Sequence, residues 1–231
     1  MDEPSNKIEW FQEWREPRNF LRKAIEWIEL TPADVQFTNP KINKYSREAF
    51  GAGLFATILN DHEPCKVRLV PESERFPDFQ LRTRDQTVDF ELTEALKPGR
   101  KRGDEYRLLQ QVRARNAGHE DKEIVGRTEA QRRAREAIPK AIRDKVQKYR
   151  VGTKVNLLVY VNIISHNEVL MSDIAGEMLL SEAELVRLTK PWCDEFQSIW
   201  LLRGSRAIRT WPTSLIRTAL SDPLGWSDAA H

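Results

Sequence analysis

Residues 77–93, PDFQLRTRDQTVDFELT, predict two neighbouring β-strands joined by a tight turn. Apolar and polar side chains alternate over residues 78–82 and again over residues 87–93, as they do in half-buried strands. Successive side chains of a strand point to opposite faces. The apolar residues of the second strand are therefore expected to enter a core, while Asp89 and Glu91 lie on the other face.

The same stretch predicts a pair of acidic side chains. A tight turn would bring Asp78, at the start of the first strand, close to Glu91 on the second. A carboxylate inside a protein is costly unless it is paired with a cation or bound to a metal. Carboxylate oxygens from adjacent strands suit a hard divalent ion, so we expect a site for Mg²⁺ or Mn²⁺ here.

Outward from this stretch, the pattern of the chain predicts helices and strands in mixed order. Helices are expected over residues 6–30 (divided at Pro17), over 106–115, over 129–149 and over 181–188, where Ser181 can cap the last one. A further helix is expected after a loop through Asn39-Pro40, from Ser46, which can cap it, to residue 59. Further strands are expected over 66–70, 155–161, 196–202 and 207–211, the last two joined as a hairpin that turns at Gly204. The glycines of GAGLFA (51–56) lie inside an expected helix, so they indicate close packing rather than a nucleotide-binding turn. This order predicts an α/β fold with a central mixed β-sheet flanked by helices.

Composition limits the class of protein. The chain has 231 residues, 40% of them hydrophobic, and no apolar run near the ~20 residues that cross a bilayer. Trp10, Trp14 and Arg15 stand where a signal peptide would be apolar. Cys65 and Cys193 are far apart and form no CxxC motif. We therefore expect reduced thiols, no membrane partner and a cytoplasmic location.

Basic residues concentrate in the middle of the chain. Residues 97–150 carry a net charge of +9, between flanking segments of −5 and −2. Such a block predicts either a surface that faces a polyanion or a pair of solvated helices, and the sequence leaves both open. In the first case the phosphate contacts are expected from these residues: Arg107, Arg113, Arg132, Arg133 and Lys148.

Pro77-Asp78, followed after twelve residues by Glu91-Leu92-Thr93, resembles the signature of the PD-(D/E)XK nucleases, the restriction-endonuclease-like superfamily. The resemblance implies a core of helix, strand meander, helix and strand over residues 46–164. Residues 1–45 would then be a helical extension packed on that core. Residues 165–231 would complete the same domain with a helix and a β-hairpin.

The resemblance also implies roles for site residues. Asp78, Glu91 and the backbone carbonyl of Leu92 would hold the divalent ion, and Glu48 matches an acidic residue on the preceding helix. Thr93 stands where the family has its lysine. Some members supply that lysine from the following helix. Lys145 is the favoured candidate there, with Lys148 and Lys97 as the others.

The function implied is a metal-dependent nuclease that hydrolyses phosphodiester bonds in DNA. Many nucleases of this fold act as dimers, so the resemblance also makes a homodimer a candidate state. Two alternatives to the nuclease stay open. One is a catalytically inactive nucleic-acid-binding protein of the same fold. The other is a protein-interaction module that uses the Trp-rich N-terminal helices.

Overall fold

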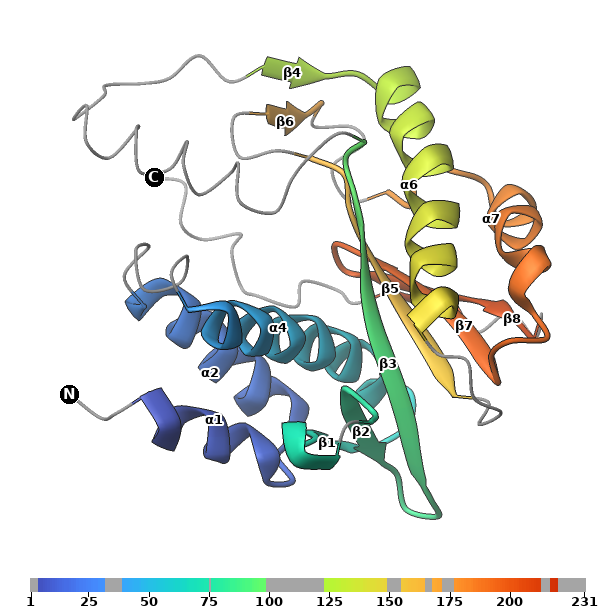
Figure 1. Cartoon of the computed structure of the whole chain (residues 1–231). Coiled ribbons are helices and arrows are strands. Elements are labelled where there is room, and N and C mark those ends of the chain that lie inside the picture. Colours follow the sequence, from blue (N-terminus) through green and yellow to red (C-terminus); the bar gives the residue numbers. More distant parts are fainter. Residues whose placement is uncertain are drawn as a thin grey trace, which may run out of the picture.

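Figure 1 shows a mixed β-sheet with helices on both sides, in a computed structural model that describes residues 4–31, 39–74, 76–98, 123–148, 155–164, 168–171, 177–212 and 217–219. Its helices are α1 (Pro4–Gln12), α2 (Pro17–Leu30), α4 (Pro40–Asn60), α6 (Arg127–Lys148) and α7 (Glu182–Thr189), with 3-10 turns η1 (Glu72–Glu74) and η3 (Lys190–Trp192). Its strands are β1 (Lys66–Leu69), β2 (Phe79–Arg82), β3 (Thr87–Leu96), β4 (Glu123–Val125), β5 (Asn156–Asn162), β6 (Glu168–Leu170), β7 (Ser198–Arg203), β8 (Arg206–Trp211) and β9 (Arg217–Ala219).

Within the described residues, the main sheet has the strand order β1-β2-β3-β5-β7-β8-β9. The central strands β3, β5 and β7 are parallel, while β1–β2–β3 and β7–β8–β9 are antiparallel. Parallel neighbours need a crossover connection. Helix α6 lies between β3 and β5 in the sequence, and α7 lies between β5 and β7. The prediction of an α/β fold with a central mixed sheet flanked by helices is confirmed.

Two hydrophobic cores cover the two faces of this sheet. On one face, α4 and the N-terminal helices bury a cluster that includes Phe55, Phe79 and Phe90. On the other face, α6 and α7 bury a second cluster that includes Leu157 and Val159 of β5. Figure 1 shows α4 and α6 on opposite sides of β3. The prediction for β3, that its apolar residues enter one core, is confirmed for Phe90 and Leu92.

Helix α4 begins earlier than expected. Its first residue is Pro40, and the Asn39 side chain caps it by accepting hydrogen bonds from the next free backbone N–H groups. The prediction that Ser46 caps this helix is wrong, because Asn before Pro is a strong start signal and Ser46 lies in the helix interior. The expected boundary between residues 45 and 46 therefore falls inside α4.

Small residues on α4 allow the close packing that was expected of them. A Cβ atom added at Gly53 would lie 3.0 Å from the Leu21 Cα of α2. One added at Gly51 would lie 3.1 Å from a methyl carbon of Leu92 on β3. The two glycines let α4 approach a helix on one side and the sheet on the other.

Several other local predictions are confirmed. Pro17 begins α2, so the N-terminal segment is divided there. The Ser181 side chain caps α7 by accepting from the Glu184 N–H. Strands β7 and β8 form a hairpin whose turn contains Gly204 at φ +53°. The helix expected over 106–115 lies outside the described residues, and no described helix is long and apolar enough to cross a membrane.

Candidate active site

Asp78 lies just before β2, at the point where β3 loses β2 as a partner and stays paired with β5 alone. Phe79 pairs with Phe90, whereas β3 runs on to Leu96, so among the described residues no strand pairs with the β2 side of β3 beyond this point. The backbone N–H of Leu92 lies in that open stretch and donates to Asp78 Oδ2 at 2.8 Å. The Asp78 carboxylate thus accepts the hydrogen bond of a backbone N–H that has no strand partner on this side of β3 among the described residues.

Glu91 lies on the face of β3 that is directed towards α6. Its neighbours Phe90 and Leu92 belong to the core on the α4 side, so the predicted alternation of side chains holds at this position. The Glu91 side chain is buried, with 1% of its surface exposed. Because a buried carboxylate is costly unless compensated, its cation partner is the decisive feature of the site.

That partner is Lys145, from the last part of α6. Its Nζ lies 2.9 Å from Asp78 Oδ2 and 2.9 Å from the Leu92 carbonyl oxygen, and it forms an ion pair with Glu91 Oε2. An ammonium group has three N–H donors, so three oxygen acceptors match its full donor capacity. We call these three oxygens, of Asp78, Glu91 and Leu92, the oxygen tripod.

Glu48 approaches the same position from the other side of the sheet. It belongs to α4, its side chain is 12% exposed, and its Oε1 lies 3.8 Å from Lys44 Nζ. Burial and then the negative charge of Asp78 raise the pKa of Glu48 to about 8. At neutral pH this carboxyl group therefore holds its proton for most of the time.

The pKa values of the two carboxyl groups, Asp78 and Glu91, are shifted in opposite directions. Burial and then the charge of Asp78 raise the pKa of Glu91 to about 7. Burial also acts to raise the pKa of Asp78, but the charge of Lys145 and hydrogen bonds with Glu91 and the Leu92 N–H outweigh it and lower that pKa. Separated pKa values in one cluster are typical of functional sites.

The oxygen tripod has the chemistry of a site for a hard divalent ion. Two carboxylate oxygens and one carbonyl oxygen converge on a single cation, here an ammonium group. Mg²⁺ and Mn²⁺ prefer oxygen ligands of these kinds. Among the described residues no group of three or more His, Cys, Asp or Glu side chains is arranged to hold a metal. The tripod has two such side chains and completes its set with the backbone.

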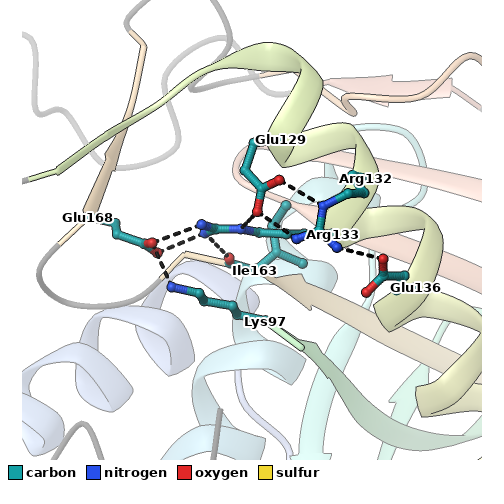
Figure 2. A network of polar contacts seen from close by, with 7 residues as sticks. All are labelled: Lys97, Glu129, Arg132, Arg133, Glu136, Ile163 and Glu168. Atoms are coloured by element: carbon teal, nitrogen blue, oxygen red, sulfur yellow. Dashed lines mark hydrogen bonds and ion pairs between the residues drawn. The ribbon is translucent and has the colours of Figure 1, made fainter. Parts of the chain in front are cut away.

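The other lysine and arginine candidates fall in different places. Figure 2 shows that Lys97 Nζ donates to Glu168 Oε1 at 2.7 Å, so Lys97 is engaged in a separate cluster. Glu168 is fully buried and also binds the guanidinium of Arg133 at 2.8 and 2.9 Å. Arg133 is 5% exposed and donates further to Glu129 and the Ile163 carbonyl. Arg133 is therefore a structural ion-pair partner rather than an available phosphate contact.

The remaining predicted nucleic-acid contacts are less defined. Arg132 is exposed, but Figure 2 shows it held between Glu129 and Glu136, at 2.8 and 2.6 Å. Arg107 and Arg113 lie outside the described residues. Lys148 is the last residue of α6, and its side chain is not among those described.

Two arginines that the sequence analysis did not single out lie on the same sheet face as the acidic pair. Arg68 on β1 and Arg82 on β2 place their guanidinium carbons 4.9 and 4.5 Å from the ring centre of Trp14. A signal for Arg82 was available in the sequence. It stands four residues after Asp78, and residues separated by an even number along a strand share a face.

Comparisons with known proteins supply no further constraint on this site. No protein-family model, no curated protein and no solved structure matches the chain.

Proposed function

We propose that this chain is a metal-dependent nuclease that hydrolyses phosphodiester bonds in DNA, with a core of the PD-(D/E)XK kind. The observation that carries the proposal is the contact of Lys145 with all three oxygens of the tripod. The motif that suggested a nuclease lacks its lysine, and Thr93 stands in that place. A lysine from α6 at the acidic pair supplies the missing cationic group.

In this proposal the tripod would hold Mg²⁺ or Mn²⁺. The ion would lower the pKa of a bound water and stabilise negative charge on the scissile phosphate. Asp78 is already ionised at neutral pH, as a metal ligand must be, because Lys145 and the Leu92 N–H lower its pKa. The ligand set needs no rearrangement of the backbone, since the Leu92 carbonyl already points towards the cation.

Lys145 and Glu48 would act beside the ion. The ammonium of Lys145 donates hydrogen bonds to oxygen atoms in this structure, and it would donate in the same way to a phosphate oxygen or to the attacking water. Glu48, which keeps its proton at neutral pH, avoids adding a third negative charge next to the phosphate. Its proton also makes it a hydrogen-bond donor at the rim of the site.

A paired metal-binding and cleavage experiment tests the proposal. Mn²⁺ and Mg²⁺ would be titrated calorimetrically into the wild type, Asp78→Asn and Glu91→Gln, with the exposed Asp194→Asn as a matched control. The same proteins would be incubated with double- and single-stranded DNA. We expect binding and cleavage in the wild type and the control, and loss of both in the two site variants. Cleavage that persists in Asp78→Asn and Glu91→Gln would refute the assignment.

One observation favours a second candidate, a nucleic-acid-binding protein that keeps the fold without catalysis. Lys145 supplies a positive counter-charge to the acidic pair within the folded chain, even without a metal. This candidate predicts salt-sensitive DNA binding, no cleavage with any divalent ion, and no calorimetric signal from Mn²⁺. The experiment above separates the two candidates.

A further inference from the structure

Beyond α6, one face of the sheet continues over β1 and β2. Helix α6 packs on β3 and β5, and Figure 1 shows β1 and β2 extending past it. Asp78, just before β2, shares this face with Gln80 and Arg82 of β2, because the intervening Phe79 and Leu81 belong to the core on the α4 side. A strand rises about 3.3 Å per residue, so Arg82 lies about 13 Å from the oxygen tripod along β2.

An aromatic ring holds two guanidinium groups at the far end of this face. The backbone of Arg15 pairs with Val67 through hydrogen bonds of 3.0 and 2.9 Å, which places residue 14 beside β1. The indole of Trp14 then lies under the guanidinium groups of both Arg68 and Arg82. Stacking of arginine on tryptophan is favourable and fixes the orientation of the planar group.

These two positive charges lack acidic partners in the described part of the chain. Arg68 uses its Nε to donate to Gln80 Oε1 at 2.8 Å, and Gln80 in turn donates to Asp89 at 2.7 Å. Neither Arg68 nor Arg82 forms an ion pair with a described residue, in contrast to Arg132, which lies between two carboxylates. Two like charges that converge on one ring are most stable when an anion lies between or above them.

We propose that Trp14, Arg68 and Arg82 form a docking surface for the phosphate backbone of a single DNA strand that leads to the oxygen tripod. The proposal rests on the nuclease function and adds the path of its substrate. Arginine binds phosphate with its terminal N–H groups. Arg82 is exposed, and the hydrogen bond from Arg68 to Gln80 uses Nε rather than the terminal nitrogens. The ring is already covered by the two guanidinium groups, so it supports them rather than stacking with a base. The surface is therefore expected to bind DNA without reading its sequence.

The spacing fits a strand that runs along β2. The separation of about 13 Å between the tripod and Arg82 corresponds to a short stretch of single-stranded DNA backbone, a few nucleotides long. A cleavage site at the tripod would then place phosphates a few nucleotides away over Arg68 and Arg82. Binding at this distance would position the strand without touching the reacting atoms.

Fluorescence anisotropy of a labelled single-stranded DNA oligonucleotide, measured in EDTA to prevent cleavage, tests the surface. Arg68→Gln and Arg82→Gln would be compared with Arg187→Gln on α7, which removes the same charge from an exposed arginine that lies 4.0 Å from a Glu184 oxygen. We expect each of the first two variants to weaken binding about tenfold at low salt. We also expect the slope of log K against log salt to fall by about 0.7 for each phosphate that is no longer neutralised. Arg187→Gln should bind like the wild type.

The outcomes separate this inference from the nuclease proposal. DNA binding that is unchanged in Arg68→Gln and Arg82→Gln, or absent in the wild type, overturns the docking surface. Poly-glutamate that competes as well as DNA at equal charge overturns DNA as the occupant. Binding that depends on the two arginines, in a wild type that cleaves no DNA with Mg²⁺ or Mn²⁺, supports the docking surface and overturns the nuclease proposal.

Discussion

Replacing Lys145 by methionine is the most informative single perturbation of this protein. The side chain is 11% exposed, and its two acidic partners, Asp78 and Glu91, are 13% and 1% exposed. Removing one partner of a buried ion pair leaves an uncompensated charge and costs about 3–5 kcal/mol. Methionine keeps most of the volume, so the loss should reflect charge rather than a cavity. We expect the free energy of unfolding at neutral pH to fall by about 3 kcal/mol.

The loss should depend on pH in a defined direction. Without the ammonium, Asp78 and Glu91 would bind protons more readily in the folded state than in the unfolded state, where their pKa values are 3.8 and 4.5. A raised folded pKa gives stability that is present at low pH and lost as the pH rises through it. The difference between wild type and Lys145→Met should therefore be small near pH 5 and larger near pH 8.

Urea unfolding followed by circular dichroism measures this difference, with Lys140→Met as the matched control on the same helix. Lys140 is 70% exposed and, among the described residues, forms an ion pair with Asp144 one turn away; such surface pairs contribute at most about 1 kcal/mol. Repeating the unfolding with Mn²⁺ adds a second readout. The ion and the ammonium would compete for the same three oxygens. Mn²⁺ should therefore stabilise Lys145→Met by about 2.7 kcal/mol at a hundredfold excess over its Kd, and the wild type by less at the same Mn²⁺ concentration.

Two results would refute this reasoning. A loss for Lys145→Met no larger than that for Lys140→Met would mean that the ammonium contributes little to the buried pair. Equal stabilisation of both proteins by Mn²⁺, or none, would mean that the ion does not bind at the oxygen tripod. The first result concerns the electrostatics of the fold, and the second concerns the proposed function.

Three further changes have expected outcomes. Because the pKa of Glu48 is about 8 against 4.5 unfolded, its contribution to stability is full below about pH 4.5 and lost as the pH rises through about 8. In urea unfolding at a series of pH values, the fall in the free energy of unfolding with rising pH should be smaller for Glu48→Gln than for the wild type, by about 2–4 kcal/mol. The same pH profile in both proteins would contradict the raised pKa of Glu48. Glu168→Gln leaves two cations around a buried amide and should lower stability by about 3 kcal/mol in the same assay; a change below about 1 kcal/mol would argue against the cluster. Gly53→Ala should lower the melting temperature and the free energy of unfolding, the latter by about 1–3 kcal/mol, because its Cβ would lie 3.0 Å from the Leu21 backbone. Gly51→Ala should destabilise less, because its Cβ would meet the flexible side chain of Leu92. A larger loss for Gly51→Ala than for Gly53→Ala would contradict the close packing of α4 on α2.

Elements with a strong local pattern could be predicted from the sequence, and elements held only by distant contacts could not. Strand β3 and the helix that Ser181 caps were predicted because periodicity and capping are properties of a few consecutive residues. Strands β4 and β6 were missed. Each has three residues, too few for an alternating pattern, and they pair with each other across more than forty positions. The start of α4 was missed because Asn39-Pro40 was interpreted as a loop, although both residues are common at helix starts.

In the candidate site too, features that depend on local sequence could be predicted, and features that depend on distant contacts could not. The proximity of Asp78 and Glu91 could be predicted from the sequence, because a short turn fixes the register of their strands. Arg133 and Arg132 are neighbours with the same charge, yet one is buried in an ion-pair cluster and the other is exposed. A clue lay in the helix period. Arg133 stands three residues after Ala130, within the alanine stripe of α6 that packs on the sheet.

The same stripe explains how Lys145 comes to the acidic pair. Ala137 and Ala141 face the sheet, and Lys145 follows Ala141 by four residues, so it extends the buried side of α6 by one turn. A lysine on that side would be destabilising over a complete sheet, because its ammonium would find only side chains of the core. It is stable here because β2 begins at Phe79 and leaves the Leu92 carbonyl and the Asp78 carboxylate open at the edge of β3. The late start of one strand and the helix period of α6 together therefore create a cation site at this position.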